Sequence, residues 1–168
     1  MAKFDFKTIG LTTRTPFRVA ASATRGYVGE PMVVIPTYTS GVSSVNTIVV
    51  GTDGMPTIAT DQFVGILAKD MEVNSAGTVL AHRTVVDVPF ANTTRIRGAV
   101  KTSTTADTES EAIGLLFDIY HWDLTSSVYT WEPASADTKG FVARWYNVAQ
   151  AALDCVADHR VLNRVDVS

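Results

Sequence analysis

The chain of 168 residues contains little of what disulfide-rich and membrane-spanning proteins need. Its single cysteine, Cys155, excludes an internal disulfide framework and a zinc site built from cysteines. No apolar run approaches the ~20 residues that span a bilayer. The N-terminus also has no continuous apolar segment of the kind found in secretory signals. We therefore expect no association with a membrane. We also expect the protein to be synthesised in a reducing cytoplasm.

The short motifs that mark common active sites are also missing. The sequence has no G-x-S-x-G, no Walker A, no H-E-x-x-H and no G-x-G-x-x-G motif. His121 and Asp123 would share one face of a strand, as a general base and its orienting carboxylate can. No third residue stands at a diagnostic spacing from them. Residues 103–111 are polar and are expected to form an exposed loop. Its three carboxylates could bind a cation or be solvated. We predict a protein that is not an enzyme and that has no catalytic residues, metal or cofactor.

Charge is scarce and unevenly distributed. Charged residues make up 18% of the chain, whose net charge is −3. Residues 1–29 hold five lysines and arginines against one aspartate, a net charge of +4, so the remainder carries −7. A basic segment beside an acidic body favours contact with an acidic surface. That surface could belong to another copy, another protein or nucleic acid.

Residues 1–30 show no clean periodicity, and we interpret them as an extended arm ahead of a β-body formed by residues 31–168. The segment has too many apolar residues for a purely solvated tail, so we expect it to contact another subunit or a neighbouring protein. The alternative is a frayed, soluble terminus. On the arm interpretation, deleting residues 1–25 leaves the body folded. The predicted contact residues of the arm are Phe4, Phe6, Arg14, Phe17, Arg18 and Arg25.

The body is predicted to be all-β, an antiparallel barrel or sandwich. Three runs rich in Val, Ile, Thr and Phe fit a pleated, half-buried surface. Turn signals separate them at Asn74–Gly77 and at Ala91-Asn92. Consecutive strands with short links favour an antiparallel meander. The three runs are Gln62–Lys69, Thr78–Phe90 and Thr93–Lys101, and further strands are expected at Met32–Tyr38, Val45–Val50, Met55–Thr60 and Gly140–Val148.

Residues 113–133 predict an aromatic β-hairpin with its turn at Thr125-Ser126. The predicted cross-strand pairs are Trp122 with Tyr129 and Tyr120 with Trp131. Because side chains alternate along a strand, all four aromatics would fall on one face. That face has three interpretations: core, subunit interface, or a platform on which sugars stack.

Two features near the strands remain. Arg95 and Arg97 would share one face of a strand, where they could bind carboxylates of a neighbour or form a local salt bridge. The acidic body argues against phosphate binding, and so against a nucleic-acid partner. Residues 148–159 fit a short helix, which would bring Cys155 next to His159. The alternative, which we prefer, is a pair of strands at Leu153–Ala157 and Val161–Val167. Cys155 itself is expected to be a small buried hydrophobe.

The order of these features resembles that of tailed-phage head decoration (cement) proteins with small β-barrel bodies, over roughly residues 26–165. The aromatic hairpin is heavier and the N-terminal segment longer than in the simplest members. The resembling features are Gly29-Glu30-Pro31 after a Thr/Ala/Arg-rich segment, Phe63-Val64-Gly65-Ile66, the run Val79–Pro89 leading to Arg95-Ile96-Arg97-Gly98, Val128–Trp131 and Gly140–Tyr146.

The resemblance implies a structural protein of the virion that has no active site. Such proteins clamp neighbouring major capsid proteins, often as trimers or through arms that overlap adjacent subunits. The expected partners are therefore a major capsid protein, other copies of this chain, or both. The alternative function that the residues leave open is a carbohydrate-binding β-sandwich that uses the aromatic hairpin.

Overall fold

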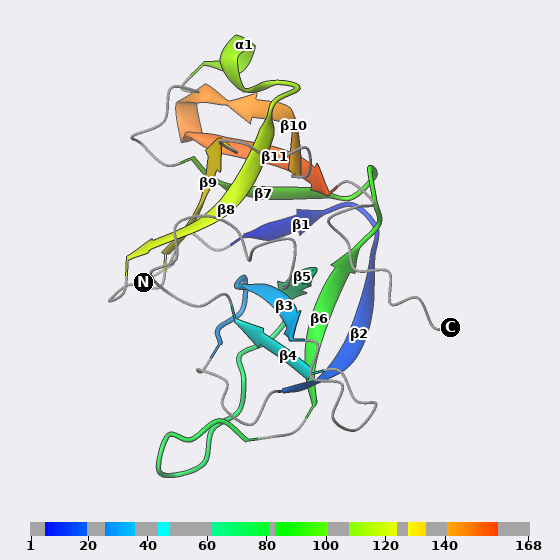
Figure 1. Cartoon of the computed structure of the whole chain (residues 1–168), viewed down its shortest axis with the longest axis vertical. Helices are drawn as coiled ribbons and strands as arrows, with labels where there is room; N and C mark the ends of the chain where they lie inside the picture. Colours follow the sequence, from blue (N-terminus) through cyan, green and yellow to red (C-terminus); the bar gives the residue numbers. More distant parts are fainter. Residues whose placement is uncertain are drawn as a thin grey trace.

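The computed structural model describes residues 6–19, 26–35, 44–47, 62–80, 83–100, 108–123, 128–133 and 141–157. In these residues most of the chain forms strands, which confirms the all-β prediction. A six-stranded sheet lies above a smaller group of five strands (Figure 1).

The six-stranded sheet is antiparallel throughout and combines the first described strand with the last. Its two central strands are β11 and β10, and β1 and β9 form its two edges. In spatial order it contains β1 (Lys7–Ile9), β7 (Arg95–Ala99), β11 (Ala152–Ala157), β10 (Phe141–Asn147), β8 (Leu116–Asp123) and β9 (Val128–Pro133).

The other five strands pair around a closed ring, a small barrel. Four of the five pairings are antiparallel, and the fifth, between β2 and β4, is parallel and consists of two residue pairs. The antiparallel prediction therefore holds for every pairing of the ring except this one. In ring order the strands are β2 (Thr12–Val19), β4 (Ser44–Thr47), β3 (Pro31–Ile35), β5 (Gln62–Leu67) and β6 (Arg83–Pro89).

Within the predicted N-terminal arm, residues 6–19 are part of the body. β1 pairs with β7, and β2 pairs with β6 from Thr12 to Arg18. β4 joins β2 only at Arg18 and Val19, so Pro16, which has no N–H to donate, lies where β2 has one described neighbour. The prediction failed because β-ladders between distant segments supply order that the local sequence pattern does not show.

The core of the six-stranded sheet is centred on Trp131, whose side chain is fully buried. Its ring centroid lies 4.7 Å from that of Phe6 and 5.0 Å from that of Phe141. The indole N–H donates to the Leu153 carbonyl at 3.0 Å. A Cβ on Gly98 would lie 2.2 Å from the Phe6 ring, so a glycine is needed for Phe6 to cross β7. The first described residue thus closes the core of the sheet.

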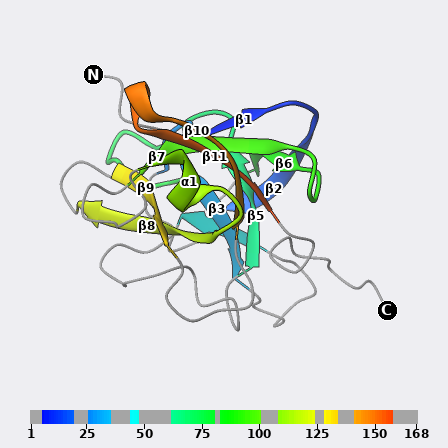
Figure 2. The ribbon, with the colours of Figure 1, turned by 90° about the horizontal axis from the view of Figure 1, so that it is seen from above.

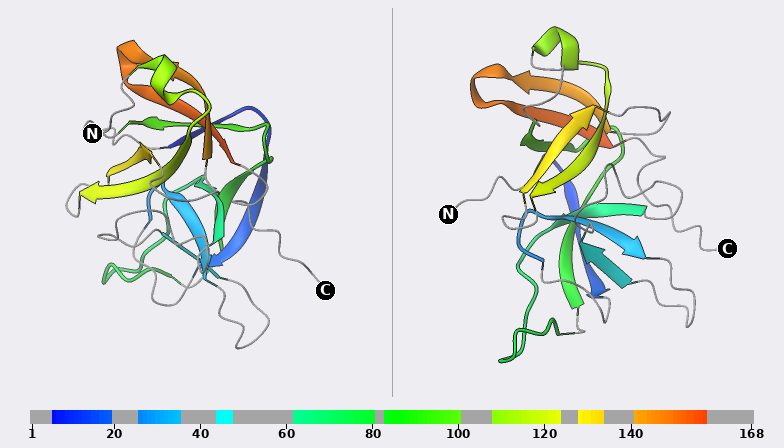
Figure 3. Two further views of the ribbon diagram at one scale, coloured as in Figure 1. Left: turned by 45° about the horizontal axis from the view of Figure 1, so that its top comes forward. Right: turned by 60° about the vertical axis from the view of Figure 1, so that its left-hand side comes forward.

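β5 connects this core to the barrel. Phe63 and Ile66 belong to the core of the six-stranded sheet, while Val64 and Leu67 belong to the barrel core. Gly65 lies between them, where a Cβ would come within 2.4 Å of the Asp87 carbonyl oxygen on β6. One strand therefore contributes to both cores, and Figure 3 shows the two groups of strands stacked directly on one another.

The predicted central meander is only half right. β5 and β6 pair as expected, but β7 leaves the barrel and enters the six-stranded sheet. The chain turns between them at the predicted site, where Asn92 has a φ of 56°. The turn at Asn74–Gly77 is also confirmed, since the Asn74 carboxamide accepts hydrogen bonds from the Ala76 and Thr78 N–H groups.

The remaining predictions are mostly close to the structure. β3, β4 and β10 fall on predicted runs, and β11 confirms the predicted strand Leu153–Ala157. The predicted strand Val161–Val167 lies outside the described residues. A short 3-10 helix, η1 (Val148–Gln150), precedes β11. The end of the predicted acidic loop forms a helical turn, α1 (Glu109–Ala112), capped by Thr108 and Glu111. The residues outside the description include 36–40, 48–61 and 158–168. The predicted strand Met55–Thr60 is among them.

Candidate interaction surface

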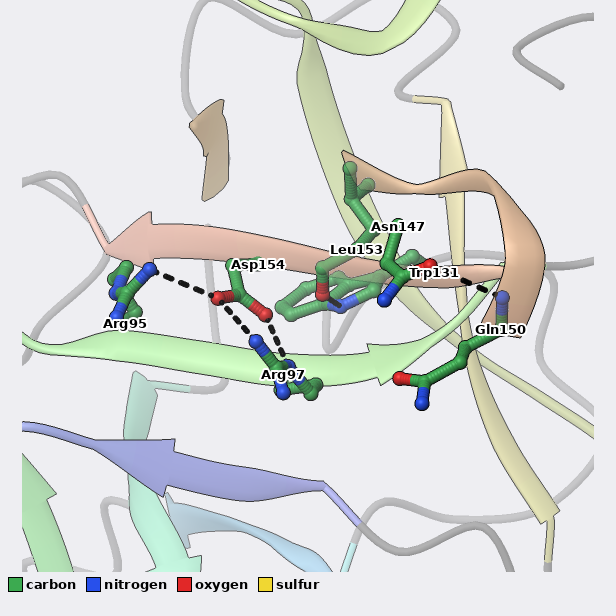
Figure 4. A network of polar contacts seen from close by, with 7 residues as sticks. All are labelled: Arg95, Arg97, Trp131, Asn147, Gln150, Leu153 and Asp154. Carbon is green, nitrogen blue, oxygen red and sulfur yellow. Dashed lines mark hydrogen bonds and ion pairs between the residues drawn. The ribbon is translucent and has the colours of Figure 1, made fainter. Parts of the chain in front are cut away.

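The face of the six-stranded sheet that points away from Trp131 carries a network of charged side chains. The carboxylate of Asp154 on β11 is fully buried. It accepts from Arg97 Nε at 2.6 Å and from Arg97 Nη2 at 3.1 Å, and its Oδ2 lies 3.3 Å from Arg95 Nη1 (Figure 4). The local salt bridge, one of the two alternatives for these arginines, is thus present.

A bulge in β10 places an aromatic ring beside this network. The register between β10 and β11 shifts between Ala143 and Trp145, so that Trp145 pairs with Asp154. The Arg97 guanidinium carbon lies 4.8 Å from the centroid of the Trp145 ring, within cation–π range. Hydrogen bonding to Asp154 raises the pKa of Arg97 above its ordinary value, against a lowering effect of burial. Arg97 is therefore fixed in place, and fully charged.

Lys7 adds a third positive charge to the same face. It pairs with Arg97 across β1 and β7, and Ile9 pairs with Arg95, so these side chains share one side of the sheet. The Lys7 side chain is exposed, and those of Arg95 and Arg97 are 44% and 34% exposed. We call Lys7, Arg95 and Arg97 the basic strip. Among the described residues, these three positive charges face one carboxylate, that of Asp154, so the strip and this carboxylate together have a net charge of about +2.

An exposed apolar corner adjoins the strip. Leu11 and Phe90 are 76% and 48% exposed, and they lie just beyond Thr12 and Pro89, the pair that ends the β2–β6 ladder. The bend between β1 and β2 and the bend between β6 and β7 lie side by side at the right-hand edge of Figure 1. Both bends are also at the right in Figure 2. We call Leu11 and Phe90 the apolar corner. Within this corner, Leu11 follows Ile9 by two residues, which places their Cα atoms within about 7 Å of each other.

Buried polar contacts hold this corner. The hydroxyl of Thr94, itself fully buried, donates to the Leu11 carbonyl and accepts from the Phe90 N–H. The Asn92 N–H donates to the Ala157 carbonyl at the end of β11. Both apolar side chains are therefore presented from a fixed backbone, which lowers the entropic cost of binding a partner.

Three of the six predicted arm contacts have other roles. Phe6 is in the core, and Phe17 packs against the barrel core. Arg14 donates from Nε to Asp87 Oδ1 at 2.9 Å on the barrel surface, a hydrogen bond that raises the pKa of Arg14. The backbone of Arg18 is in β2, and its side chain lies outside the description. Phe4 and Arg25 are among the residues that are not described.

The aromatic hairpin forms with a different register from the predicted one. Asp123 pairs with Val128, as the predicted turn requires. A bulge between His121 and Asp123 then shifts each pair farther from the turn by one residue. Tyr120 therefore pairs with Thr130. Since a one-residue shift exchanges the faces of a strand, the predicted four-aromatic face is wrong. Trp131 is core; the side chains of Tyr120, Trp122 and Tyr129 are outside the description.

Cys155 is buried in the core, as predicted. Burial, and secondarily the charge of Asp154, raise the pKa of its thiol well above the ordinary value. The side chains of His121 and Asp123 lie outside the description. Within the described part of the chain, no group of three or more His, Cys, Asp or Glu could hold a metal ion. No described helix has the length and apolar content to cross a bilayer.

Sequence reasoning found Arg95 and Arg97 but missed the other members of this surface. Asp154 and Trp145 gave no signal, because a lone aspartate in a strand reads as an exposed residue and the bulge at residues 143–145 has no turn residue to mark it. Leu11 is one of several apolar residues in the predicted arm, and the sequence pattern does not set it apart from the others. The exposure of Phe90 follows from the bend after Pro89, where the local sequence shows only a turn.

Comparison with known proteins gave no match to a family model, a curated protein or a solved structure.

Proposed function

We propose that this protein is a non-enzymatic structural protein of a virion, a decoration protein that binds and stabilises neighbouring major capsid proteins. The observation that carries the proposal is the apolar corner beside the basic strip, on a body held rigid by two joined cores. An exposed Leu–Phe pair next to positive charge that the described carboxylates do not fully offset is typical of a protein-binding surface. The resemblance to head decoration proteins points to the same kind of partner.

The proposal differs from the sequence-based hypothesis in where contact is made. Phe6, Arg14 and Phe17 are part of the folded body, so contact through an arm at these residues is not proposed. A fixed surface repeated on many copies would instead stabilise a shell, since modest contacts multiply with copy number. A homo-oligomer, with the trimer as the first expectation, is part of this proposal.

The test is co-sedimentation of the purified chain with capsid-sized particles from its source lysate, with light scattering of the free protein alongside. We expect saturable binding to the particles at a fixed number of copies per shell. Light scattering reports whether the free chain is a trimer. A chain that stays in the supernatant at every concentration would contradict the proposed function.

The carbohydrate-binding alternative has lost support. It depended on four aromatic residues on one face of the hairpin, and Trp131 is fully buried in the core. No contact described above favours a sugar ligand, so we do not propose it as a second function.

A further inference from the structure

We propose that the basic strip and the apolar corner form one docking surface, and that its ligand is an acidic protein segment carrying an apolar side chain at one end. The inference rests on the proposed function, because it takes the neighbour to be another protein of the particle. It adds the location of the surface on this chain and the chemistry of the segment that binds there.

Among the described residues, the strip holds more positive charge than the buried carboxylate needs. Arg97 alone makes two hydrogen bonds to Asp154, an arrangement that satisfies both carboxylate oxygens. Arg95 adds a single longer contact and is 44% exposed. Lys7 is exposed beside them. Arg95 and Lys7 are therefore available to a second carboxylate without loss of the buried ion pair.

The strip also favours one kind of anion. The spacing of Arg95 and Arg97 along β7 suits a carboxylate, since both arginines reach the carboxylate of Asp154. The chain as a whole has a net charge of −3, which opposes the approach of a long polyanion such as nucleic acid. A short run of carboxylates avoids that repulsion because it needs to contact only the strip.

The apolar corner adjoins the strip. Leu11 follows Ile9 by two residues, and Ile9 pairs with Arg95 at the end of the strip. A segment that lies along the strip with its carboxylates on Lys7 and Arg95 would reach Leu11 and Phe90 within about two further residues. The corner then provides apolar burial and the strip provides orientation, the usual division between these two kinds of contact.

The binding test uses a short fluorescein-labelled peptide that combines a run of glutamates with a terminal pair of leucines, titrated with the full chain and followed by fluorescence anisotropy. We expect saturable binding that weakens as salt is added. The strip variant, Lys7→Gln with Arg95→Gln, should lower affinity at least tenfold. Its control, Arg14→Gln with Lys69→Gln, removes the same charge elsewhere on the surface and should bind as the wild type does.

The apolar corner is tested in the same way. Leu11→Ser with Phe90→Ser should also lower affinity at least tenfold. The matched control is Ile113→Ser with Leu115→Ser, which removes two exposed apolar side chains beyond α1. Far-UV circular dichroism of each variant verifies that it is folded, and single substitutions of Lys7 and Leu11 replace any double variant that is not.

Several results would overturn the inference. One is a wild-type chain that does not bind the peptide. Another is a peptide affinity that is equal in the strip variant and its control, or equal in the corner variant and its control. A third is that the chain binds single-stranded DNA of the same charge more tightly than the peptide. Self-association that depends on the strip would overturn the choice of a different protein as ligand.

Particle co-sedimentation separates this inference from the proposed function. Particle binding that survives both the strip and the corner variants contradicts the docking surface and leaves the function standing. Strip-dependent peptide binding by a chain that ignores particles contradicts the virion function and leaves the docking surface standing.

Discussion

At the scale of single residues, the feature that most needs explanation is a fully buried aspartate in a central strand. Burying an unpaired carboxylate costs several kcal/mol, so its partners decide whether the strand is stable. Asp154 pairs with Arg97 across β11 and β7, and Arg97 is also held over the Trp145 ring. The cluster is therefore a structural element, and only its exposed rim, Arg95 with Lys7, is open to a partner.

Replacing Arg97 should be much more damaging than replacing Arg95. Arg97→Met removes both short hydrogen bonds to a buried carboxylate, and we expect a loss of roughly 3 kcal/mol in the free energy of unfolding. Arg95→Met removes a longer, half-exposed contact and should cost about 1 kcal/mol or less. Urea unfolding of the two variants gives the comparison. Equal losses would show that Asp154 does not depend on Arg97 in particular.

Cys155 makes the stability of the protein sensitive to alkaline pH. The fold raises the pKa of this thiol, so the folded chain keeps the proton while the unfolded chain releases it above a pKa of about 8.5. The unfolded state then binds fewer protons, and the stability falls as the pH rises, by at most about 1.4 kcal/mol per unit.

The matched variant for this effect is Cys155→Ala. It should be less stable at neutral pH because it leaves a cavity, but its stability should decline less between pH 7 and 9.5 than that of the wild type. Urea unfolding across this range measures both slopes. Parallel curves for the two proteins would refute the role of the thiol.

At the scale of strands, two bulges determine which side chains share a face. The bulge between His121 and Asp123 shifts the aromatic hairpin by one residue and separates Tyr120 from Trp131 in register. The bulge between Ala143 and Trp145 brings Trp145 opposite Asp154. A bulge inserts one unpaired residue and exchanges the two faces beyond it, so each one redirects a whole segment.

The N-terminal strands should be indispensable to the fold. Deleting residues 1–19 removes β1, β2 and Phe6, and with them one edge of the large sheet, one strand of the barrel ring and part of the core. We expect an insoluble or unfolded product by circular dichroism. Deleting residues 1–5, which leaves Phe6 and both strands in place, is the control and should fold. A folded product from the longer deletion would restore the arm interpretation.

At the scale of the whole molecule, the two groups of strands share β5 and cannot fold independently. Phe63 packs against Phe141 in the large core with ring centroids 5.0 Å apart, while its neighbour Val64 faces the barrel core. The β1–β2 and β6–β7 bends also link both groups, and Thr94 connects them by hydrogen bonds. The described residues therefore behave as one cooperative unit.

Cooperativity can be measured directly. We expect a single thermal transition with the same midpoint by far-UV circular dichroism and by tryptophan fluorescence, although Trp131 reports only on the large core. Phe63→Ala should lower both midpoints equally, at a cost of about 3–5 kcal/mol. Two separated transitions in either protein would show that the barrel and the large sheet unfold independently.

The sequence by itself determined the local properties of this protein. The all-β class follows from β-branched and aromatic runs, the turns at Asn74–Gly77 and Asn92 follow from residues that tolerate positive φ, and the pairing of Asp123 with Val128 follows from the turn between them. Each of these depends on neighbours in the chain, so a local pattern is sufficient to predict it.

Only the tertiary structure decided what joins what over long distances. Residues 6–19 became strands because β6 and β7 pair with them, and Arg97 met Asp154 across 57 residues of sequence because β11 lies beside β7. Leu11 and Phe90 came together by the same route. Such pairings depend on the total burial and hydrogen bonding of the whole chain, and a single bulge changes their register, so no local pattern can specify them.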